Sequence, residues 1–304
     1  MEYNPKVFRE YDIRGYVDKD LSEEFAFKLG IAIGIFAKRE NLENLSAIVG
    51  FDCRESSPRY SDSLCRGLVN QGFQVSTIGM VPTPVVYHAT TKLRASVGVA
   101  VTGSHNPKDM NGFKIIVNER SLSGKEIQDL RTIFENLSIE QGVNSDSDKI
   151  RKLEYLNSYI DDIVSNVEPF LGNRNLDIAL DYGNGVAGIT CIPIMEKLGI
   201  RAHHLFSEPN PDFPNHHPDP TVEKNLEELK HYCREHSISL GFAFDGDGDR
   251  IGMIIGDGRI VPGDMLLLLL ANSLLKHHPG ETIIGDVKCS SVLFDEIQRL
   301  GGKP

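Results

Sequence analysis

Hydrophobic and polar residues follow two spacings along this chain, and together they predict an α/β protein. Residues 21–39 carry apolar side chains at helical spacing, from Phe25 to Phe36, after Ser22, a residue type that often caps a helix. Short apolar runs typical of buried strands lie between such segments. We expect strands at residues 47–51, 73–78 and 238–244, and further helices at residues 59–71 and 125–137. This alternation favours helices packed on mostly parallel sheets.

The segments between these elements predict where the chain divides. Residues 138–149 are polar, and we expect a domain boundary there. Residues 207–220 hold five prolines in fourteen residues, which excludes a helix or a central strand and predicts an extended, ordered loop. Asp219 and Pro220 at its end fit the cap and the first residue of a helix that reaches His236.

A weak internal repeat indicates that the fold is built from similar units. Residues 96–104 match residues 239–247 in Ser, Gly, Ala and a later Gly, and a third copy of the segment upstream begins at residues 283–286. We therefore expect tandem three-layer α/β/α domains with mixed, mostly parallel sheets, as two complete units and the start of a third. The expected domain limits are residues 1–148, 149–256 and 257–304.

Composition limits the classes of partner that the protein can bind and the cellular compartment in which we expect it. The net charge of −11 argues against nucleic acid and anionic membranes as partners. The apolar run at residues 265–275 would cross only about half of a bilayer core, so it predicts a buried helix, interrupted at Asn272–Ser273. The five cysteines are odd in number and form no C-x-x-C, and the N-terminus is polar, so we expect a reducing, cytoplasmic location. The histidine pairs lack metal-finger spacing, so zinc is not expected.

The run from Asp245 to Arg250, DGDGDR, predicts a metal site. Carboxylates are the ligands that Mg²⁺ prefers, and the glycines let the backbone aim Asp245, Asp247 and Asp249 at one point. The run follows an expected strand, at the sheet edge where open α/β folds bind ligands. A calcium-binding EF-hand loop does not fit. It needs glycine at its sixth position and glutamate at its twelfth, and counting from Asp245 these positions are Arg250 and Gly256. A plain solvated turn is the remaining alternative.

The repeat places a second loop, TGSHNP at residues 102–107, in the equivalent position. Ser104 stands between Gly103 and His105, and a serine hydroxyl facing a metal site suggests phosphoryl transfer. Such a site needs cations, and three candidates are Arg14, Lys114 and Arg250. The alternatives are an ordinary Ser/Asn/Pro turn and, for Arg14, a surface arginine.

A competing motif, G-x-G-x-x-G, spans Gly183–Gly188. It follows an expected strand, and Glu208 comes about 20 residues later, as in dinucleotide-binding folds. This pattern leaves open an NAD-dependent oxidoreductase. The simpler interpretation is a tight turn from strand to helix.

Three segments together resemble the α-D-phosphohexomutase superfamily: FREYDIRG at 8–15, TGSHNP at 102–107 and DGDGDR at 245–250. NGFK at 111–114 and NHHPDP at 215–220 also fit, and YDIRG is similar to the phosphomannomutase/phosphoglucomutase branch. The resemblance implies an enzyme that interconverts hexose 1- and 6-phosphates through a phosphoserine and a hexose 1,6-bisphosphate. By resemblance, Ser104 carries the phosphate and binds one Mg²⁺ together with Asp245, Asp247 and Asp249.

The resemblance also implies roles for other residues. Those matching Arg14, Lys114 and Arg250 would contact phosphate and handle protons, and His105 would shape the serine loop. Tyr11, Arg14 and Lys288 are expected to contact the phosphorylated hexose.

Length is the departure from the family pattern. Family members carry a sugar-recognition loop in a third domain, and a fourth domain binds the non-reacting phosphate, but neither is present in this sequence. We therefore expect a truncated or split gene product with little activity alone, which would need a separate C-terminal portion if the gene is split. The sequence does not decide whether the substrate is a mannose or a glucose phosphate. It also leaves open a non-catalytic, regulatory protein with the same fold.

Overall fold

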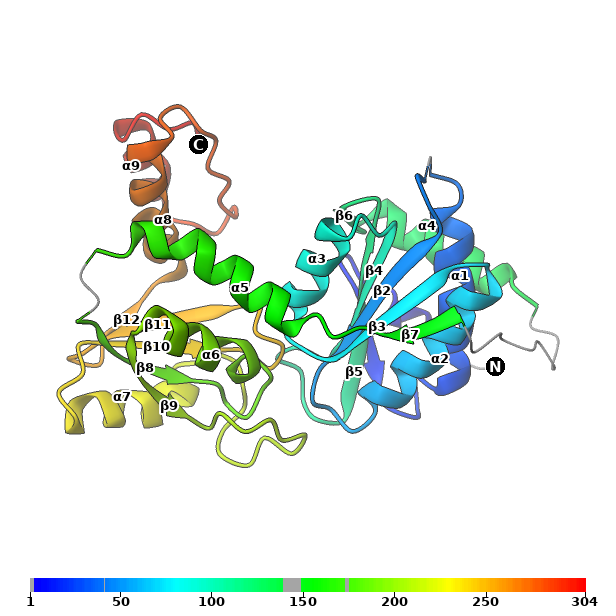
Figure 1. Cartoon of the computed structure of the whole chain (residues 1–304), viewed down its shortest axis with the longest axis horizontal. Helices are drawn as coiled ribbons and strands as arrows, with labels where there is room; N and C mark the ends of the chain where they lie inside the picture. The colour runs from blue at the N-terminus through cyan, green and yellow to red at the C-terminus, as the bar shows by residue number, and fades with distance from the viewer. Residues whose placement is uncertain (1–2, 41, 139–148, 173–174) are drawn as a thin grey trace.

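Two mixed β-sheets with helices on both faces account for most of the structure (Figure 1). The computed structural model describes residues 3–40, 42–138, 149–172 and 175–304. The predicted boundary at 138–149 therefore lies almost wholly outside the described residues. Among the helices that are described, none combines the length and the apolar content needed to cross a membrane.

The first sheet has the order β1-β5-β4-β2-β3-β7, with β6 paired to β5. Its strands β4, β2, β3 and β7 run parallel, whereas β1, β5 and β6 add antiparallel pairs on one side. The strands are β1 (Ile13–Tyr16), β2 (Ser46–Phe51), β3 (Gln74–Met80), β4 (Val97–Val101), β5 (Met110–Val117), β6 (Arg120–Ser121) and β7 (Ile150–Lys152).

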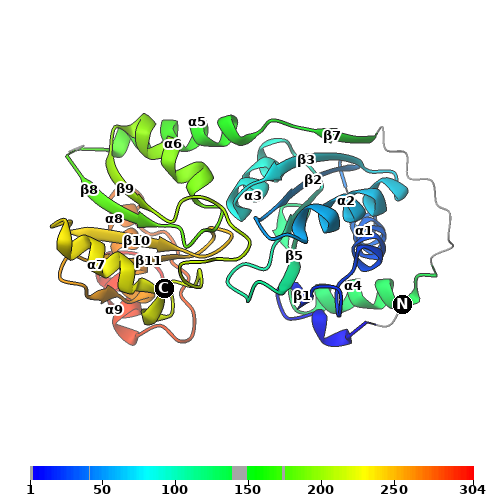
Figure 2. The ribbon, with the colours of Figure 1, turned by 90° about the horizontal axis from the view of Figure 1, so that it is seen from below.

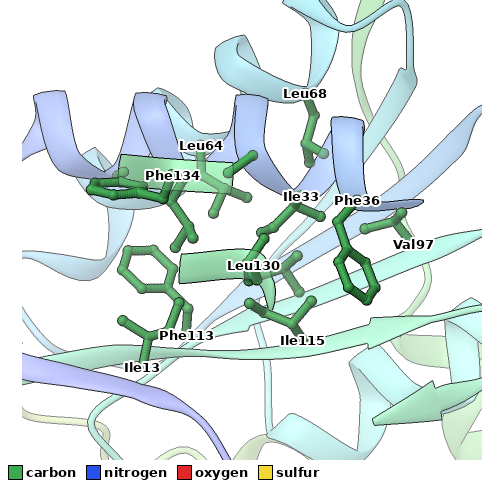
Figure 3. Packing of buried hydrophobic residues seen from close by; sticks show 14 of the residues in the cluster. Ile13, Ile33, Phe36, Leu64, Leu68, Val97, Phe113, Ile115, Leu130 and Phe134 are labelled. Carbon is green, nitrogen blue, oxygen red and sulfur yellow. The ribbon is translucent and has the colours of Figure 1, made fainter. Parts of the chain in front are cut away.

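Helices on one face of this sheet enclose the largest apolar core. They are α1 (Glu23–Ala37), α2 (Ser57–Asn70) and α4 (Lys125–Asn136). Ser22 caps α1 as predicted, because its side chain accepts a hydrogen bond from Phe25 N at 3.0 Å. Phe113 of β5 meets Leu130 and Phe134 of α4 in this core (Figure 3). Each large apolar side chain buried in this way contributes about 1.5–3 kcal/mol, which holds the helices on the sheet.

On the opposite face lies α3 (Thr83–Lys92), next to α5 (Leu156–Val167). Figure 2 shows β7 and α5 running along one side of both halves of the molecule. Because α5 packs on α3 and also on α6 (Gly188–Leu198), it bridges the two sheets.

The second sheet repeats the central order of the first. It runs β12-β11-β10-β8-β9, with parallel β10, β8 and β9 and antiparallel β11 and β12. Helix α7 (Glu227–Glu235) covers one face and α6 the other. The order β11-β10-β8-β9 matches β5-β4-β2-β3, which confirms the first two copies of the predicted repeat. The strands are β8 (Asp177–Asp181), β9 (Arg201–Leu205), β10 (Leu240–Phe244), β11 (Ile251–Ile255) and β12 (Ile260–Val261).

The sheets extend past the predicted domain limits at 148 and 256. Strand β7 begins at Ile150 and pairs with β3 of the first sheet, and β12 begins at Ile260 and pairs with β11 of the second. The helix predicted from Pro220 also shifts. Asp219 Oδ1 accepts from Thr221 N at 3.0 Å and closes a turn, so α7 starts only at Glu227, after a short 3-10 helix.

The last part of the chain forms α8 (Gly263–His277) and α9 (Ser291–Arg299), and here the local predictions hold only in part. Helix α8 runs without interruption through Asn272–Ser273. It is buried on one face only, because Ala271 and Leu275 are buried whereas Leu269 and Leu270 are 54% and 61% exposed. Residues 283–286 do not form a strand. Thr282 makes an isolated bridge with Lys303, and no longer ladder forms because no other described strand lies beside it.

Candidate active site

Two loops from the carboxyl ends of equivalent strands meet between the two halves of the molecule. One follows β4 and carries Ser104, and the other follows β10 and carries Asp245. The Ser104 hydroxyl donates to Asp245 Oδ2 at 2.7 Å. Gly246 permits this approach, because a Cβ there would lie 2.6 Å from the Ser104 carbonyl oxygen. The structure thus brings together the two loops that the repeat paired.

The three aspartates of the second loop form one cluster. Asp245, Asp247 and Asp249 each place a carboxylate oxygen within 4.8 Å of the others, and the first two are fully buried. Asp245 Oδ1 accepts from the backbone N–H groups of Asp249 (3.1 Å) and Arg250 (3.0 Å), which fixes its orientation. Such convergence of hard oxygen atoms suits a divalent cation.

Asp247 supplies a specific test of whether a cation fits. Its Oδ2 accepts from Lys114 Nζ and from the Thr83 hydroxyl, each at 2.6 Å. Its Oδ1 is buried and has no hydrogen-bond partner among the described residues. A buried carboxylate oxygen without a partner is costly, so the donor set fits a metal ligand at this position.

One partly buried cation, Lys114, offsets part of the negative charge of the cluster. Burial raises the pKa of Asp245, and the neighbouring Asp247 and Asp249 raise it further. Burial also opposes ionisation of Asp247, but Lys114 outweighs it and lowers the pKa of this carboxyl. Burial disfavours the Lys114 ammonium as well, yet the two carboxylates that it contacts raise its pKa above the ordinary value. Lys114 is therefore held charged against Asp247 and Asp249.

Ser104 has an unusual backbone for a residue with a side chain. Its φ is 50°, in the left-handed region, and its N–H donates to the Thr102 hydroxyl at 2.7 Å. Its hydroxyl also lies 3.2 Å from His105 Nδ1. Burial and the nearby Arg250 and Arg14 lower the pKa of His105 to about 4. His105 is therefore neutral near pH 7, with one ring nitrogen free of a proton and able to accept a hydrogen bond.

A cavity of about 700 Å³ opens beside these loops. Arg14 is buried on its wall, fixed by Asp12 Oδ2 at 2.8 Å and by the Gly103 carbonyl at 2.8 Å. The predicted residues that line it are Tyr11, Arg14, His105, Lys114, Asp249 and Arg250. Tyr11 is 74% exposed at its mouth. The cations on the wall suit an anionic small molecule.

Lys288 is the predicted site residue that lies neither in the two loops nor on the cavity wall. It lies exposed in the turn before α9, where its N–H donates to Asp286 Oδ1 at 2.8 Å. Sequence reasoning in turn missed Thr83 and the pair Asp52 and Arg54, which hold the two loops from behind. Nothing in the local sequence marks them, because their contacts join segments far apart in the chain.

The glycine-rich turn at Gly183–Gly188 makes a close contact with the aspartate loop. Val186 N donates to the Gly246 carbonyl at 3.1 Å, and a Cβ on Gly185 would lie 2.7 Å from the same oxygen. The turn therefore needs glycine to support the aspartate loop. This contact accounts for the motif without a dinucleotide.

Both halves of the chain are similar to known proteins. Residues 5–140 match the family model described as phosphoglucomutase/phosphomannomutase, alpha/beta/alpha domain I, and residues 157–258 match domain II of the same family. The phosphomannomutase/phosphoglucomutase of Pseudomonas putida is 42% identical over 299 residues, which is 98% of this chain and 62% of that protein. The phosphoglucomutase of Neisseria gonorrhoeae is 37% identical over 297 residues, with 98% and 63% covered.

A solved structure shows the same arrangement over the whole chain. The crystal structure of a phosphoglucomutase/phosphomannomutase family protein from Burkholderia thailandensis has a TM-score of 0.91 and 35% sequence identity. The match covers 100% of this chain and 66% of that one. The chain thus spans a little under two thirds of the length of the proteins that it matches.

Proposed function

We propose that this chain, which belongs to the phosphoglucomutase/phosphomannomutase family, carries the phosphoryl-transfer centre of a mutase for hexose 1- and 6-phosphates. The observation that carries the proposal is the Ser104 hydroxyl, 2.7 Å from a carboxylate of the Asp245 cluster and beside a cavity lined by cations. A hydroxyl, a cation site and an anion-binding wall are the parts that phosphoryl transfer to and from serine requires.

The metal would be held by Ser104, Asp245, Asp247 and Asp249. Their oxygen-only donor set favours Mg²⁺, as does the buried Asp247 Oδ1, which has no hydrogen-bond partner in the described part of the chain. When bound, such an ion neutralises charge on the phosphoryl oxygens. In the same proposal, Lys114 balances the carboxylates and holds them in place.

The cavity wall would bind the phosphorylated hexose. The Arg14 guanidinium is fixed by Asp12 and Gly103 and faces the cavity, and Arg250 lies exposed at its edge. Guanidinium groups bind phosphate through paired N–H donors, so these two arginines would orient the transferred group or the sugar phosphate. Tyr11 at the mouth would contact the sugar. Lys288 would need to approach from the α8–α9 segment.

The chemistry is a transfer between two oxygen atoms. When a hexose 1,6-bisphosphate phosphorylates the protein, a sugar O–P bond breaks and the Ser104 Oγ–P bond forms. The serine proton ends on the sugar oxygen that leaves, and neutral His105 is placed to relay it, 3.2 Å from Oγ. In a mutase turnover the phosphoserine gives its phosphate to the free hydroxyl of a hexose monophosphate, which forms the 1,6-bisphosphate, and Ser104 then takes up the phosphate from the other sugar oxygen of that bisphosphate.

Phosphorylation of the chain tests this proposal directly. The chain is incubated with glucose 1,6-bisphosphate and Mg²⁺, and the product is examined by intact mass and peptide mapping. We expect one phosphate, on Ser104, lost in Ser104→Ala and retained in Ser121→Ala, a serine on the same cavity without the Asp245 contact. Phosphate on another residue, or none, would contradict the proposal and favour a non-catalytic protein on this fold.

A further inference from the structure

We infer that Arg54 is a positioning residue for this phosphoryl transfer, because it holds the loop that presents Ser104. The inference rests on the proposed function for its catalytic consequence, but its structural part concerns the backbone of Ser104 alone. Arg54 is only 2% exposed, follows β2, and is absent from the cavity wall. It can therefore affect the reaction only through the residues that it contacts.

The Arg54 guanidinium is a hub for the serine loop. Its Nε donates to Asp52 Oδ2 at 3.1 Å. Its two terminal nitrogens donate to three backbone carbonyls of the serine loop, those of Ser104 (2.9 Å), Asn106 (2.6 Å) and Pro107 (2.6 Å), and to that of Met110 (3.0 Å) at the start of β5. A planar group with five N–H donors can serve this many acceptors at once, and a lysine ammonium cannot.

The same pair reaches Ser104 from its other side. Asp52 Oδ2 accepts from the Thr102 hydroxyl at 2.8 Å and from Gly103 N at 3.0 Å, and the Thr102 oxygen in turn accepts from Ser104 N at 2.7 Å. Both the N–H and the carbonyl of Ser104 are therefore tied to the Asp52–Arg54 ion pair. A left-handed φ of 50° persists in a residue with a Cβ only where its surroundings enforce it.

The contacts also set the electrostatics of the loop. Four carbonyl oxygens point to the guanidinium instead of the cavity, so their negative ends do not face a bound phosphate. Gly103 allows the guanidinium to come this close, since a Cβ there would lie 2.3 Å from Arg54 Nε. One buried side chain thus sets both the shape of the loop and the direction in which its carbonyl dipoles point.

A residue of the second half covers this arrangement. The Phe213 ring, from the proline-rich loop at 207–220, lies 5.3 Å from the Arg54 guanidinium carbon. His217 of the same loop donates from Nε2 to the His105 carbonyl. Arg54 therefore lies between the β2 side and the loop that carries these two contacts, which shields its hydrogen bonds from water.

The test compares Arg54→Lys with Arg59→Lys, the same substitution at a more exposed arginine of α2 that pairs with Asp18. The first readout is the rate of Ser104 phosphorylation by glucose 1,6-bisphosphate. We expect it to fall about 100-fold in Arg54→Lys, the effect of misplacing a reacting group by about 1 Å, and to stay unchanged in Arg59→Lys. The second readout needs no turnover. It is the ¹³Cα and ¹³Cβ chemical shift of Ser104, which depends on the backbone φ and ψ, in chains labelled at serine.

We expect the left-handed shifts of Ser104 to be lost in Arg54→Lys while the other serine signals stay in place. Should Arg54→Lys not fold, Thr102→Val cuts the link to Ser104 N and must shift the same signals. Unchanged Ser104 shifts in the folded variant, or an unchanged phosphorylation rate, would overturn the inference. If the wild-type chain takes no phosphate, the proposed function fails, and the chemical shifts still decide whether Arg54 positions Ser104.

Discussion

Replacing Thr83 with valine isolates one hydrogen bond to the aspartate cluster. Thr83 is 1% exposed at the start of α3, and its hydroxyl donates to Asp247 Oδ2 at 2.6 Å. Valine has nearly the same shape, so the change removes the bond with little repacking. A hydrogen bond to a charged group is worth about 1.5–3 kcal/mol, and because Lys114 still contacts this oxygen we expect a loss of about 2 kcal/mol.

Thermal unfolding followed by circular dichroism measures this loss. For units of about 150–250 residues, 2 kcal/mol lowers the midpoint by roughly 4–8 °C. The matched control is Thr90→Val in the same helix, where a fully buried hydroxyl donates to the neutral Val86 carbonyl at 2.7 Å and about 1 kcal/mol is expected.

Metal affinity gives an independent measurement on the same two variants. A residue that orients a metal ligand typically changes affinity by about 10–100-fold, so calorimetry should show Mg²⁺ bound at least tenfold more weakly by Thr83→Val. Thr90→Val should bind Mg²⁺ like the wild type. If Thr83→Val is no less stable than Thr90→Val and binds Mg²⁺ normally, the Thr83 bond does not hold Asp247.

Three further predictions follow from the same site. Mg²⁺ should raise the unfolding midpoint of the wild type but not of Asp247→Asn, because only the intact cluster binds it in the folded state. Gly246→Ala, whose Cβ would lie 2.6 Å from the Ser104 carbonyl, should cost about 1–3 kcal/mol in chemical denaturation, whereas Gly263→Ala in open space should be near neutral. The lowered pKa of His105 predicts stability that is complete above pH 6.5 and falls toward pH about 4, because only the unfolded chain takes up the proton. His105→Gln should reduce that loss, and an unchanged stability profile against pH would refute the assignment.

The sequence predicted the fold wherever a local pattern had a local cause. Ser22 caps α1 because capping needs only residues within one turn, and the repeat located both site loops because equivalent strands end at equivalent places. Residues 283–286, where the third copy of the repeat begins, form no strand, although the equivalent residues of the first two copies lie in β2 and β8. A strand also requires a neighbouring strand to pair with, and the local sequence does not show whether one is present.

The candidate site shows the same limit. Ser104 and the aspartates were found because a short motif concentrates their chemistry in a few positions. Thr83 and Arg54 were missed because a threonine after a proline and an arginine after a strand are ordinary residues. Their importance comes from contacts 164 positions away in the case of Thr83, and 50 to 56 positions away for the Arg54 carbonyl contacts. These residues become neighbours only through the topology of the folded chain.

Helix α3 explains how a site divided between two sheets keeps its geometry. Its first residue, Thr83, binds the aspartate loop, and one turn further His88 contacts the Tyr155 hydroxyl at 2.9 Å and Asp162 at 2.8 Å, both at α5. On its other side, α5 packs on α6 of the second unit, where Asp161 pairs with Lys197. Helix α3 is therefore linked to the second unit in two ways. Its Thr83 bonds directly to the aspartate loop, and α5 connects it to α6. Because α5 packs on both α3 and α6, these helices oppose rotation of one sheet against the other and so help to keep Ser104 beside Asp245.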